Sequence, residues 1–315
     1  MTDQASKGKW NAYEYVTQRL LMELESGKCP WQSPYLASGE HRSLATGQSY
    51  NGINTLLLTM EAIARGFASP WWSTLRAANK LGGSVRRGEH GAKVFFFKPV
   101  VTKEKDTEAE EEEKHRRLVL RAYTVFNIEQ LDGIVAPAAQ PHAVDVEPHA
   151  AAEAMWASYA ANGGPARKEH RAGPAFYRRV DDVVSLPEPG LVTSTEEYYL
   201  MLFHEGVHST GHESRLSRAG IRKDDYAPFG SPTYSQEELV AEMGAAMLAY
   251  RAGLELPWSN SAAYLRGWYE KLRQDKRCAV FAAKQAEKAA RWILGERAFK
   301  QPNAPNAEDF TEVAA

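Results

Sequence analysis

The pentapeptide His204-Glu205-Gly206-Val207-His208 contains the residues that point most directly to chemistry. Two histidines four residues apart lie on one face of a helix, so both imidazoles can reach the same metal ion. Glu205, next to the first histidine, is then placed to take a proton from a water molecule at that ion. The spacing predicts a hydrolytic metal centre with His204 and His208 as ligands and Glu205 as general base.

Two histidines leave such a centre incomplete, because hydrolytic zinc usually takes three protein ligands and keeps one position for water. His212 follows His208 by four residues, but Gly211 lies between them and interrupts the helix that would carry His212 to the ion. The spacing also begins like that of the metzincins, yet Ser214 occupies the position of their third histidine. The third ligand is therefore expected from another segment.

The segment 237–242 offers that ligand, because Glu238 and Glu242 lie four residues apart on a helix face that also carries apolar side chains. Two carboxylates on a packed face are costly unless a cation receives them. We predict Glu238 as the third ligand and Glu242 as the acceptor for a histidine N–H, with reversed roles as the alternative. The expected ion is Zn²⁺, with another divalent ion such as Mn²⁺ as the alternative. Tyr234 and His212 are candidate donors to the oxyanion.

Two helices must position these side chains. The first is expected from Thr195, as its N-cap, to about Gly211, and the second over about 235–252. The rest of the second half predicts a helix over 151–161, extended segments around 175–177 and 182–186, and two further helices within 260–296.

The first half predicts a mixture of helices and strands. Helices are expected over 10–26, 53–65 and 72–81, and strands over 84–86, 93–97 and 118–126, with the charged run 104–114 as a solvated hairpin loop. An Ala- and Pro-rich stretch then separates the halves. The expected organisation is an N-terminal domain over 8–134, a linker over 135–149, a C-terminal domain over 150–298 and a disordered tail over 299–315.

Composition is that of a globular protein with a normal core. The chain has 315 residues, of which 43% are hydrophobic and 25% charged. No apolar stretch reaches membrane-spanning length, and the polar start of the chain lacks the core of a secretory signal. Two cysteines far apart in sequence, Cys29 and Cys278, favour a reducing compartment. We expect a cytoplasmic protein with no membrane partner.

The first half is basic, which is typical of a polyanion-binding surface and also of many ordinary solvated surfaces. Residues 1–103 contain 13 Lys+Arg against 7 Asp+Glu. Aromatic side chains interleaved with cations can stack on the bases of single-stranded DNA, although most aromatic residues in any domain belong to its core. The candidate DNA contacts are Trp31, Tyr50, Asn51, Asn54, Trp72, Arg76, Lys80, Arg86, Arg87 and Lys93.

An ordered series of motifs in both halves resembles the ArdC-type antirestriction proteins of conjugative plasmids and phages. In the second half the series is Ala175-Phe176-Tyr177, Glu197-Tyr198-Tyr199, the segment from His204 to His208, Thr210-Gly211-His212 and the glutamates from Glu237 to Glu242. In the first half it is Pro30-Trp31, the segment from Tyr50 to Asn54, Trp71-Trp72 and the segment from Gly88 to Lys93. Together these motifs extend over most of residues 10–297.

The resemblance implies an α+β protein of two domains. The N-terminal domain would bind single-stranded DNA, and the C-terminal domain would be a zincin-like, gluzincin-type metallopeptidase with a glutamate as third zinc ligand. It also implies protection of incoming plasmid or phage DNA from host restriction endonucleases, with a host restriction protein or another protein as the peptidase substrate. Two alternatives remain: a metallopeptidase whose first domain recognises a protein, and a DNA-binding protein with a catalytically idle metal site.

Overall fold

The structure is a computed structural model that describes residues 11–31, 39–102, 115–137, 148–171, 173–192, 194–222, 232–255 and 262–296. The predicted loop at 104–114, the predicted tail at 299–315 and most of the predicted linker lie outside these ranges. In the described part of the chain, no helix combines the length and the apolar character needed to cross a bilayer.

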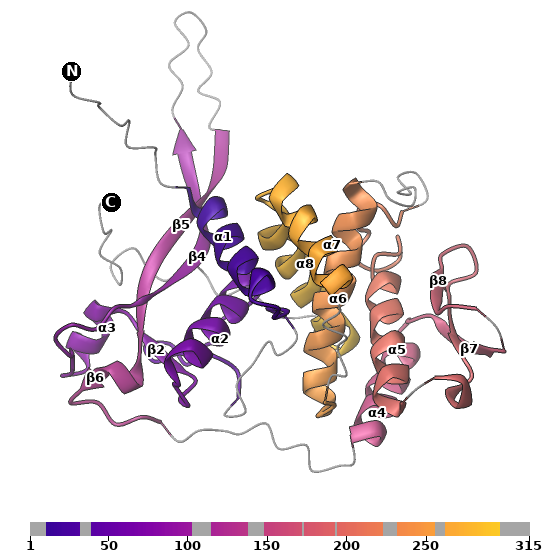
Figure 1. Cartoon of the computed structure of the whole chain (residues 1–315), viewed down its shortest axis with the longest axis horizontal. Coiled ribbons are helices and arrows are strands. Elements are labelled where there is room, and N and C mark those ends of the chain that lie inside the picture. Colours follow the sequence, from indigo (N-terminus) through magenta and orange to yellow (C-terminus); the bar gives the residue numbers. More distant parts are fainter. Residues whose placement is uncertain are drawn as a thin grey trace, which may run out of the picture.

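The N-terminal module is built around a long antiparallel hairpin (Figure 1). Its strands are β4 (Ala92–Thr102) and β5 (His115–Asn127), and Ala92 pairs with Val125. Two short strands, β1 (Arg42–Ser43) and β2 (Trp71–Ser73), extend the sheet in the order β1-β2-β5-β4. A separate two-stranded sheet joins β3 (Ser84–Val85) to β6 (Leu131–Asp132).

Three helices accompany this sheet. Helix α1 (Ala12–Glu25) begins at Asn11, whose side chain accepts hydrogen bonds from two backbone N–H groups of the first turn. Helix α2 (Ile53–Arg65) ends at Gly66, which adopts the left-handed conformation (φ 70°) that glycine tolerates best. The third is α3 (Leu75–Lys80). In Figure 1, α1 and α2 lie between the hairpin and the helices of the second module.

The predicted helix over 72–81 is wrong in its first part. Trp71 to Ser73 form strand β2 instead, and the helix starts only after Thr74, whose hydroxyl accepts the backbone N–H of Ala77. Adjacent tryptophans favour a strand, and a threonine that bonds the backbone ahead of it starts a new helix rather than continuing one.

The second module packs helices against a small sheet (Figure 1). The sheet has the order β7-β9-β8, with β7 at Ala166–His170, β9 at Val183–Pro187 and β8 at Phe176–Arg178. The sequence pattern did not predict β7. The helices are α4 (Pro148–Ala161), α5 (Thr195–Ser209), α6 (Pro232–Ala252), α7 (Ala262–Gln274) and α8 (Cys278–Ile293). Two short 3₁₀ turns occur at Ile128–Gln130 and Pro189–Leu191.

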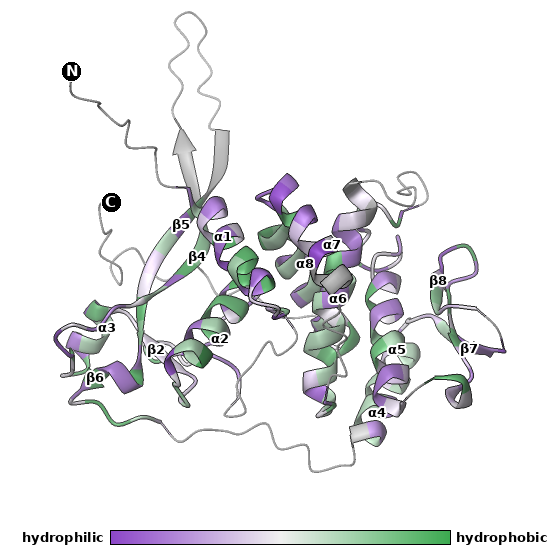
Figure 2. Ribbon diagram, in the orientation of Figure 1, coloured by the Kyte–Doolittle hydropathy of each residue, from purple (hydrophilic) through white to green (hydrophobic). Residues whose placement is uncertain are grey.

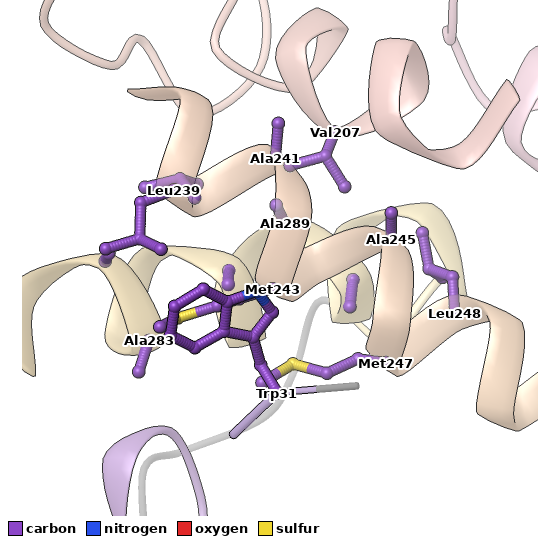
Figure 3. Close-up of a cluster of buried hydrophobic side chains, with 14 of the residues drawn as sticks. Trp31, Val207, Leu239, Ala241, Met243, Ala245, Met247, Leu248, Ala283 and Ala289 are labelled. Atoms are coloured by element: carbon purple, nitrogen blue, oxygen red, sulfur yellow. The ribbon is translucent and has the colours of Figure 1, made fainter. Parts of the chain in front are cut away.

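The two modules share one hydrophobic core. Apolar side chains of α1 and α2 lie in the same buried cluster as those of α5, α6 and α8, and Figure 2 shows the apolar character of α2 and α6. Trp31 is fully buried in this cluster beside Met243 and Met247 of α6 (Figure 3). Arg251 also forms an ion pair with Glu40 of the first module. The modules therefore pack as one body.

Candidate metal centre

Helix α5 presents the two histidines of the pentapeptide on one face. The helix begins at Ser194, whose hydroxyl accepts the backbone N–H of Glu197, so the N-cap lies one residue before the predicted Thr195. Leu202 and Phe203 of the same helix are fully buried and anchor it in the core. Gly206 lets α5 approach α4 closely, because a Cβ there would lie 3.1 Å from the ring of Trp156.

The predicted ligands converge. One ligand atom from each of His204, His208 and Glu238 lies within 4.8 Å of the others. The two histidine Nε2 atoms are 3.2 Å apart, and the Glu238 carboxylate oxygens lie 3.6 Å from Nε2 of His204 and 3.5 Å from Nε2 of His208. Ligands held tetrahedrally at about 2.05 Å from zinc are about 3.3 Å from one another. The three side chains therefore fit a divalent ion of that size.

The charges of the cluster favour a cation among its nitrogens. Burial disfavours a charged imidazole at His208, but the carboxylates of Glu237 and Glu238 outweigh it and raise the pKa of His208 to about 10. At His204, burial again disfavours the charged imidazole. The hydrogen bond to Glu238 outweighs burial, so the pKa of His204 is also raised. Burial alone would raise the pKa of Glu238, yet both imidazoles hold it well below its usual range. A divalent ion would replace protons on these same atoms.

Glu237 supports the centre from behind, and its role was missed in the sequence. One of its oxygens lies 3.4 Å from Nδ1 of His208, the ring nitrogen that faces away from the other ligands. The buried guanidinium of Arg218 binds both oxygens of Glu237 and also donates to the backbone carbonyl of Val207 at 2.7 Å. A carboxylate that holds the second nitrogen of a ligating histidine fixes the orientation of its ring.

Glu242 lies on the other side of His204, with a carboxylate oxygen 4.0 Å from Nδ1. This distance is longer than a hydrogen bond, but Glu242 lies on the side of His204 where an acceptor for its Nδ1–H would have to lie. Glu238, not Glu242, lies within ligand distance of both histidines, which favours the first of the two predicted assignments.

A cavity of about 640 Å³ opens at the centre. His204, Glu205, His208 and Glu238 line it, together with residues 174–180, which contain strand β8. Glu205 is buried beside the ligands, as a general base for a water molecule at the ion must be.

The two candidate oxyanion donors have different outcomes. His212 does not line the cavity, and its Nδ1 lies 2.8 Å from the hydroxyl of Ser214 instead. Its assignment as a donor is wrong, because the turn after α5 directs it elsewhere. Tyr234 lies within α6, but its side chain is outside the described residues.

Four predicted DNA contacts belong to the core instead. Trp31 and Trp72 are fully buried, and Tyr50 and Asn54 are nearly so. Trp72 donates its indole N–H to Nδ1 of buried His41 at 3.0 Å. Asn54 holds strand β4, because its side chain bonds both the N–H and the C=O of one residue there, at 2.7 and 2.8 Å. Side chains committed in this way cannot stack on a base, so their assignment to DNA binding is wrong.

The predicted cations are better placed. Arg76 and Lys80 on α3, and Arg86 and Arg87 after β3, are exposed on two elements that pack against each other. We call these four residues the basic corner. Of these four, Arg86 also donates to the carboxylate of Glu89 at 3.1 Å and to the backbone carbonyl of Glu129. Lys93 differs in being half-buried, and its ammonium donates to the hydroxyl of Thr124 at 2.8 Å.

Comparison with known proteins accounts for both modules. The family model for the N-terminal domain of anti-restriction factor ArdC matches residues 10–126, and the model for zincin-like metallopeptidases matches residues 151–285. Protein y4eC of Sinorhizobium fredii is 32% identical over 310 residues, which cover 96% of this chain and 97% of that protein. DNA primase TraC of Escherichia coli is 34% identical over 308 residues, which cover 92% of this chain but 27% of TraC.

Solved structures give the same result for the fold. The metal-free and Mn(II)-bound crystal structures of antirestriction protein ArdC from plasmid R388 superpose with TM-scores of 0.73 and 0.70. Both are 32% identical to this chain, and each match covers 93% of this chain and 100% of the other. The predicted fold class, α+β with a zincin-like second domain, is confirmed, and a zincin-like domain implies a divalent metal.

Proposed function

Because this chain belongs to the family of ArdC-type antirestriction proteins, we propose that it binds single-stranded DNA and protects incoming plasmid or phage DNA from host restriction endonucleases. We further propose that its second module is a zinc-dependent peptidase, with Mn²⁺ as the alternative ion. The observation that carries the second proposal is the convergence of two histidines and one glutamate in a cavity that also contains Glu205.

The residues of the cavity have separate roles in this proposal. His204, His208 and Glu238 hold the ion, which when bound polarises a substrate carbonyl and lowers the pKa of water. Glu205 accepts the proton of the attacking water and returns it to the leaving amine. Glu237 keeps His208 in the tautomer that leaves Nε2 free to bind the ion.

Strand β8 supports a peptide as the substrate. It lines the cavity beside the histidines, and among the described strands it pairs with β9 alone. An extended peptide can add to such an edge through backbone hydrogen bonds, which hold it without regard to most of its sequence. A metal site with a purely structural role has no use for an open cavity of this kind next to its ligands.

The peptidase proposal is tested with Glu205→Gln. We expect this variant to keep its divalent ion and to lose all cleavage of a host restriction protein incubated with it. Glu270→Gln, the same change on an exposed position of α7, is the control and should cleave normally. Full cleavage by the metal-loaded Glu205→Gln protein would refute the assignment of the base. If Glu205→Gln protects DNA from restriction as well as the wild-type protein does, catalysis at the metal site is not needed for that protection.

The basic corner supports the DNA-binding proposal, because it gathers four exposed cations on two adjacent elements, and phosphates bind to such clusters of cations. If all four contact phosphates, the logarithm of the affinity for single-stranded DNA falls with the logarithm of the salt concentration with a slope of about −3. Arg87→Ala should reduce that slope by about 0.7 and weaken binding equally for all sequences. Arg266→Ala, an exposed cation of the second module, is the control. No binding at low salt would refute the proposal.

A further inference from the structure

The cavity at the metal centre contains charges of both signs. Helices α5 and α6 contribute three carboxylates, those of Glu205, Glu237 and Glu238. The segment 174–180 contributes Arg178 and Arg179, and no other Lys or Arg is among the described residues that line the cavity. The proposed metal centre accounts for the carboxylates but gives the two arginines no role. They are therefore candidates for contact with the substrate itself.

The two arginines lie on opposite faces of their segment. Exposed and partly buried residues alternate over 176–180, as they do along an extended chain. Arg178 faces outward, with 53% of its side chain exposed, and forms an ion pair at 2.5 Å with Asp181 of the same turn. Only 19% of the Arg179 side chain is exposed, and this residue alternates with Arg178. Arg179 is therefore the arginine that faces inward.

The guanidinium of Arg179 has N–H groups to spare. Its one ion pair among the described residues is with Glu213, whose carboxylate is half-exposed and lies 4.0 Å away, too far for a hydrogen bond. The guanidinium donates no hydrogen bond to any described residue. A guanidinium presents five N–H donors in a planar fork that matches a carboxylate. A carboxylate that enters the cavity can therefore bind Arg179 through charge-assisted hydrogen bonds.

A buried cluster fixes the segment of Arg179 against helix α5. The side chain of Arg215, which is 2% exposed, donates to the backbone carbonyl of Ser209 at the end of α5 at 2.8 Å. It also binds both carboxylate oxygens of Asp182 and donates to the hydroxyl of Tyr177 at 3.1 Å. Tyr177 and Asp182 lie on either side of Arg179 in the chain, and Ser209 directly follows the second ligand histidine. Arg179 is thus preorganised relative to the proposed metal ligands.

We propose that Arg179 selects a protein substrate with an acidic side chain, aspartate or glutamate, close to the bond that is cleaved. The inference rests on the proposed peptidase function and deepens it by naming the substrate class. A phosphate of DNA also binds guanidinium groups, but it brings further negative charges on both sides. The three carboxylates of the same cavity would repel those charges, which favours a peptide as the source of the anion.

The test measures the binding of peptide hydroxamates to the full-length, Zn²⁺-loaded protein by isothermal titration. The hydroxamate binds the metal ion, so the measurement does not depend on cleavage. Two series of alanine-based peptides carry the hydroxamate at the C-terminal or at the N-terminal end, so that the peptide extends from the ion in either direction. Glutamate, glutamine or lysine replaces alanine at each of the two positions nearest the hydroxamate in turn. At one of these positions we expect glutamate to bind at least about tenfold more tightly than glutamine, and lysine to bind more weakly than glutamine.

Variants assign this preference to Arg179. Arg179→Met should bind the glutamate and glutamine probes equally and keep the wild-type affinity for the glutamine probe. Arg179→Glu should prefer lysine to glutamate at the same position, a reversal that a loss of structure cannot produce, and Arg179→Lys should keep a weaker preference for glutamate. Arg171→Met is the matched control, because Arg171 follows β7 of the same sheet, is 89% exposed and does not line the cavity. Arg178→Met should also keep the preference, and thermal melting confirms that each variant is folded.

The outcomes separate the two levels of the proposal. If no hydroxamate binds the wild-type protein, both the peptidase function and this inference are overturned. If hydroxamates bind but glutamate is preferred at none of the positions, or the preference survives in Arg179→Met, or it is lost in Arg178→Met instead, the inference alone is overturned. The titrations are repeated with a short single-stranded oligonucleotide present, which should leave the preference for glutamate unchanged. If the oligonucleotide abolishes that preference, Arg179 binds a phosphate of DNA and the acidic peptide is overturned.

Discussion

Removal of Arg218 should destabilise the protein strongly, because its partner Glu237 is buried. Only 5% of the Arg218 side chain and 7% of the Glu237 side chain are exposed. Arg218→Met would leave the carboxylate charged in the interior without its guanidinium and would remove one of the donors to the carbonyl of Val207. Breaking a buried ion pair from one side costs about 3–5 kcal/mol. For a domain of this size that corresponds to a fall in melting temperature of roughly 6–20 °C.

The double variant Arg218→Met, Glu237→Met distinguishes the loss of an ion pair from the loss of packing. Since it removes both charges together, it should recover most of the stability that Arg218→Met loses, as is often found when a buried pair is replaced by apolar side chains. Urea unfolding of the wild-type protein, both single variants and the double variant gives the coupling free energy, measured with a chelator present so that metal binding does not contribute. A loss below about 1 kcal/mol for Arg218→Met, or no recovery in the double variant, would refute the reasoning.

The same variants separate stability from metal binding. Because Glu237 holds Nδ1 of His208, the double variant should still bind the divalent ion about 10- to 100-fold more weakly than the wild-type protein, although its stability has recovered. Isothermal titration with Zn²⁺ measures this loss. Wild-type affinity in a double variant that lacks Glu237 would show that the carboxylate does not orient the ligand.

Three further predictions follow from other parts of the structure. Glu238→Ala should purify without stoichiometric metal, as measured by elemental analysis, whereas an ion retained at full occupancy would exclude Glu238 as a ligand. Burial lowers the pKa of His41 to about 3. As the pH falls from 6.5 towards 3, the imidazole of His41 is therefore protonated in the unfolded state before it is protonated in the folded state, and the free energy of unfolding decreases. Between pH 7 and pH 5, the free energy of unfolding measured with urea should fall by about 2 kcal/mol less in His41→Gln than in the wild-type protein. An identical pH dependence in both proteins would contradict this. A Cβ at Gly244 would lie 2.7 Å from a side chain of α5, so Gly244→Ala should destabilise the protein by about 1–3 kcal/mol in thermal melting. A Cβ at Gly267 on α7 would have nothing within 4 Å, so Gly267→Ala should stabilise the protein by up to about 1 kcal/mol in the same measurement.

The convergence of His204, His208 and Glu238 could be predicted from the sequence because it follows from helix geometry. His204 and His208 lie on one face of α5 by their spacing alone, and the pairing with Glu238 required only that two adjacent helices face each other. The role of Glu237 could not be predicted in the same way. It depends on Arg218 reaching α6 from the turn after α5, and the path of that turn is set by tertiary packing rather than by any local pattern.

The errors in the first module also have a physical origin. An aromatic residue among cations has the same local pattern whether it lies on the surface or in a core, so the sequence could not show that Trp31 and Trp72 are buried. What buries them lies far away in the chain. Trp31 packs against α6, more than two hundred residues later, and Trp72 is held by the imidazole of His41. The exposure of cations such as Arg87 was easier to predict, because a charged side chain in a turn is rarely buried in a core.

The shared core joins the module proposed to bind DNA to the module that carries His204, His208 and Glu238. Helix α8 places Lys284 next to Phe97 of the first module, and nine residues later the same helix places Ile293 next to Gly206 of α5, which carries His204 and His208. A helix packed on both sides moves as a unit, since displacement at one end would open voids at the other. Because α6, which carries Glu238, also packs on α8, a change of packing at the junction of the modules would reach the proposed metal centre.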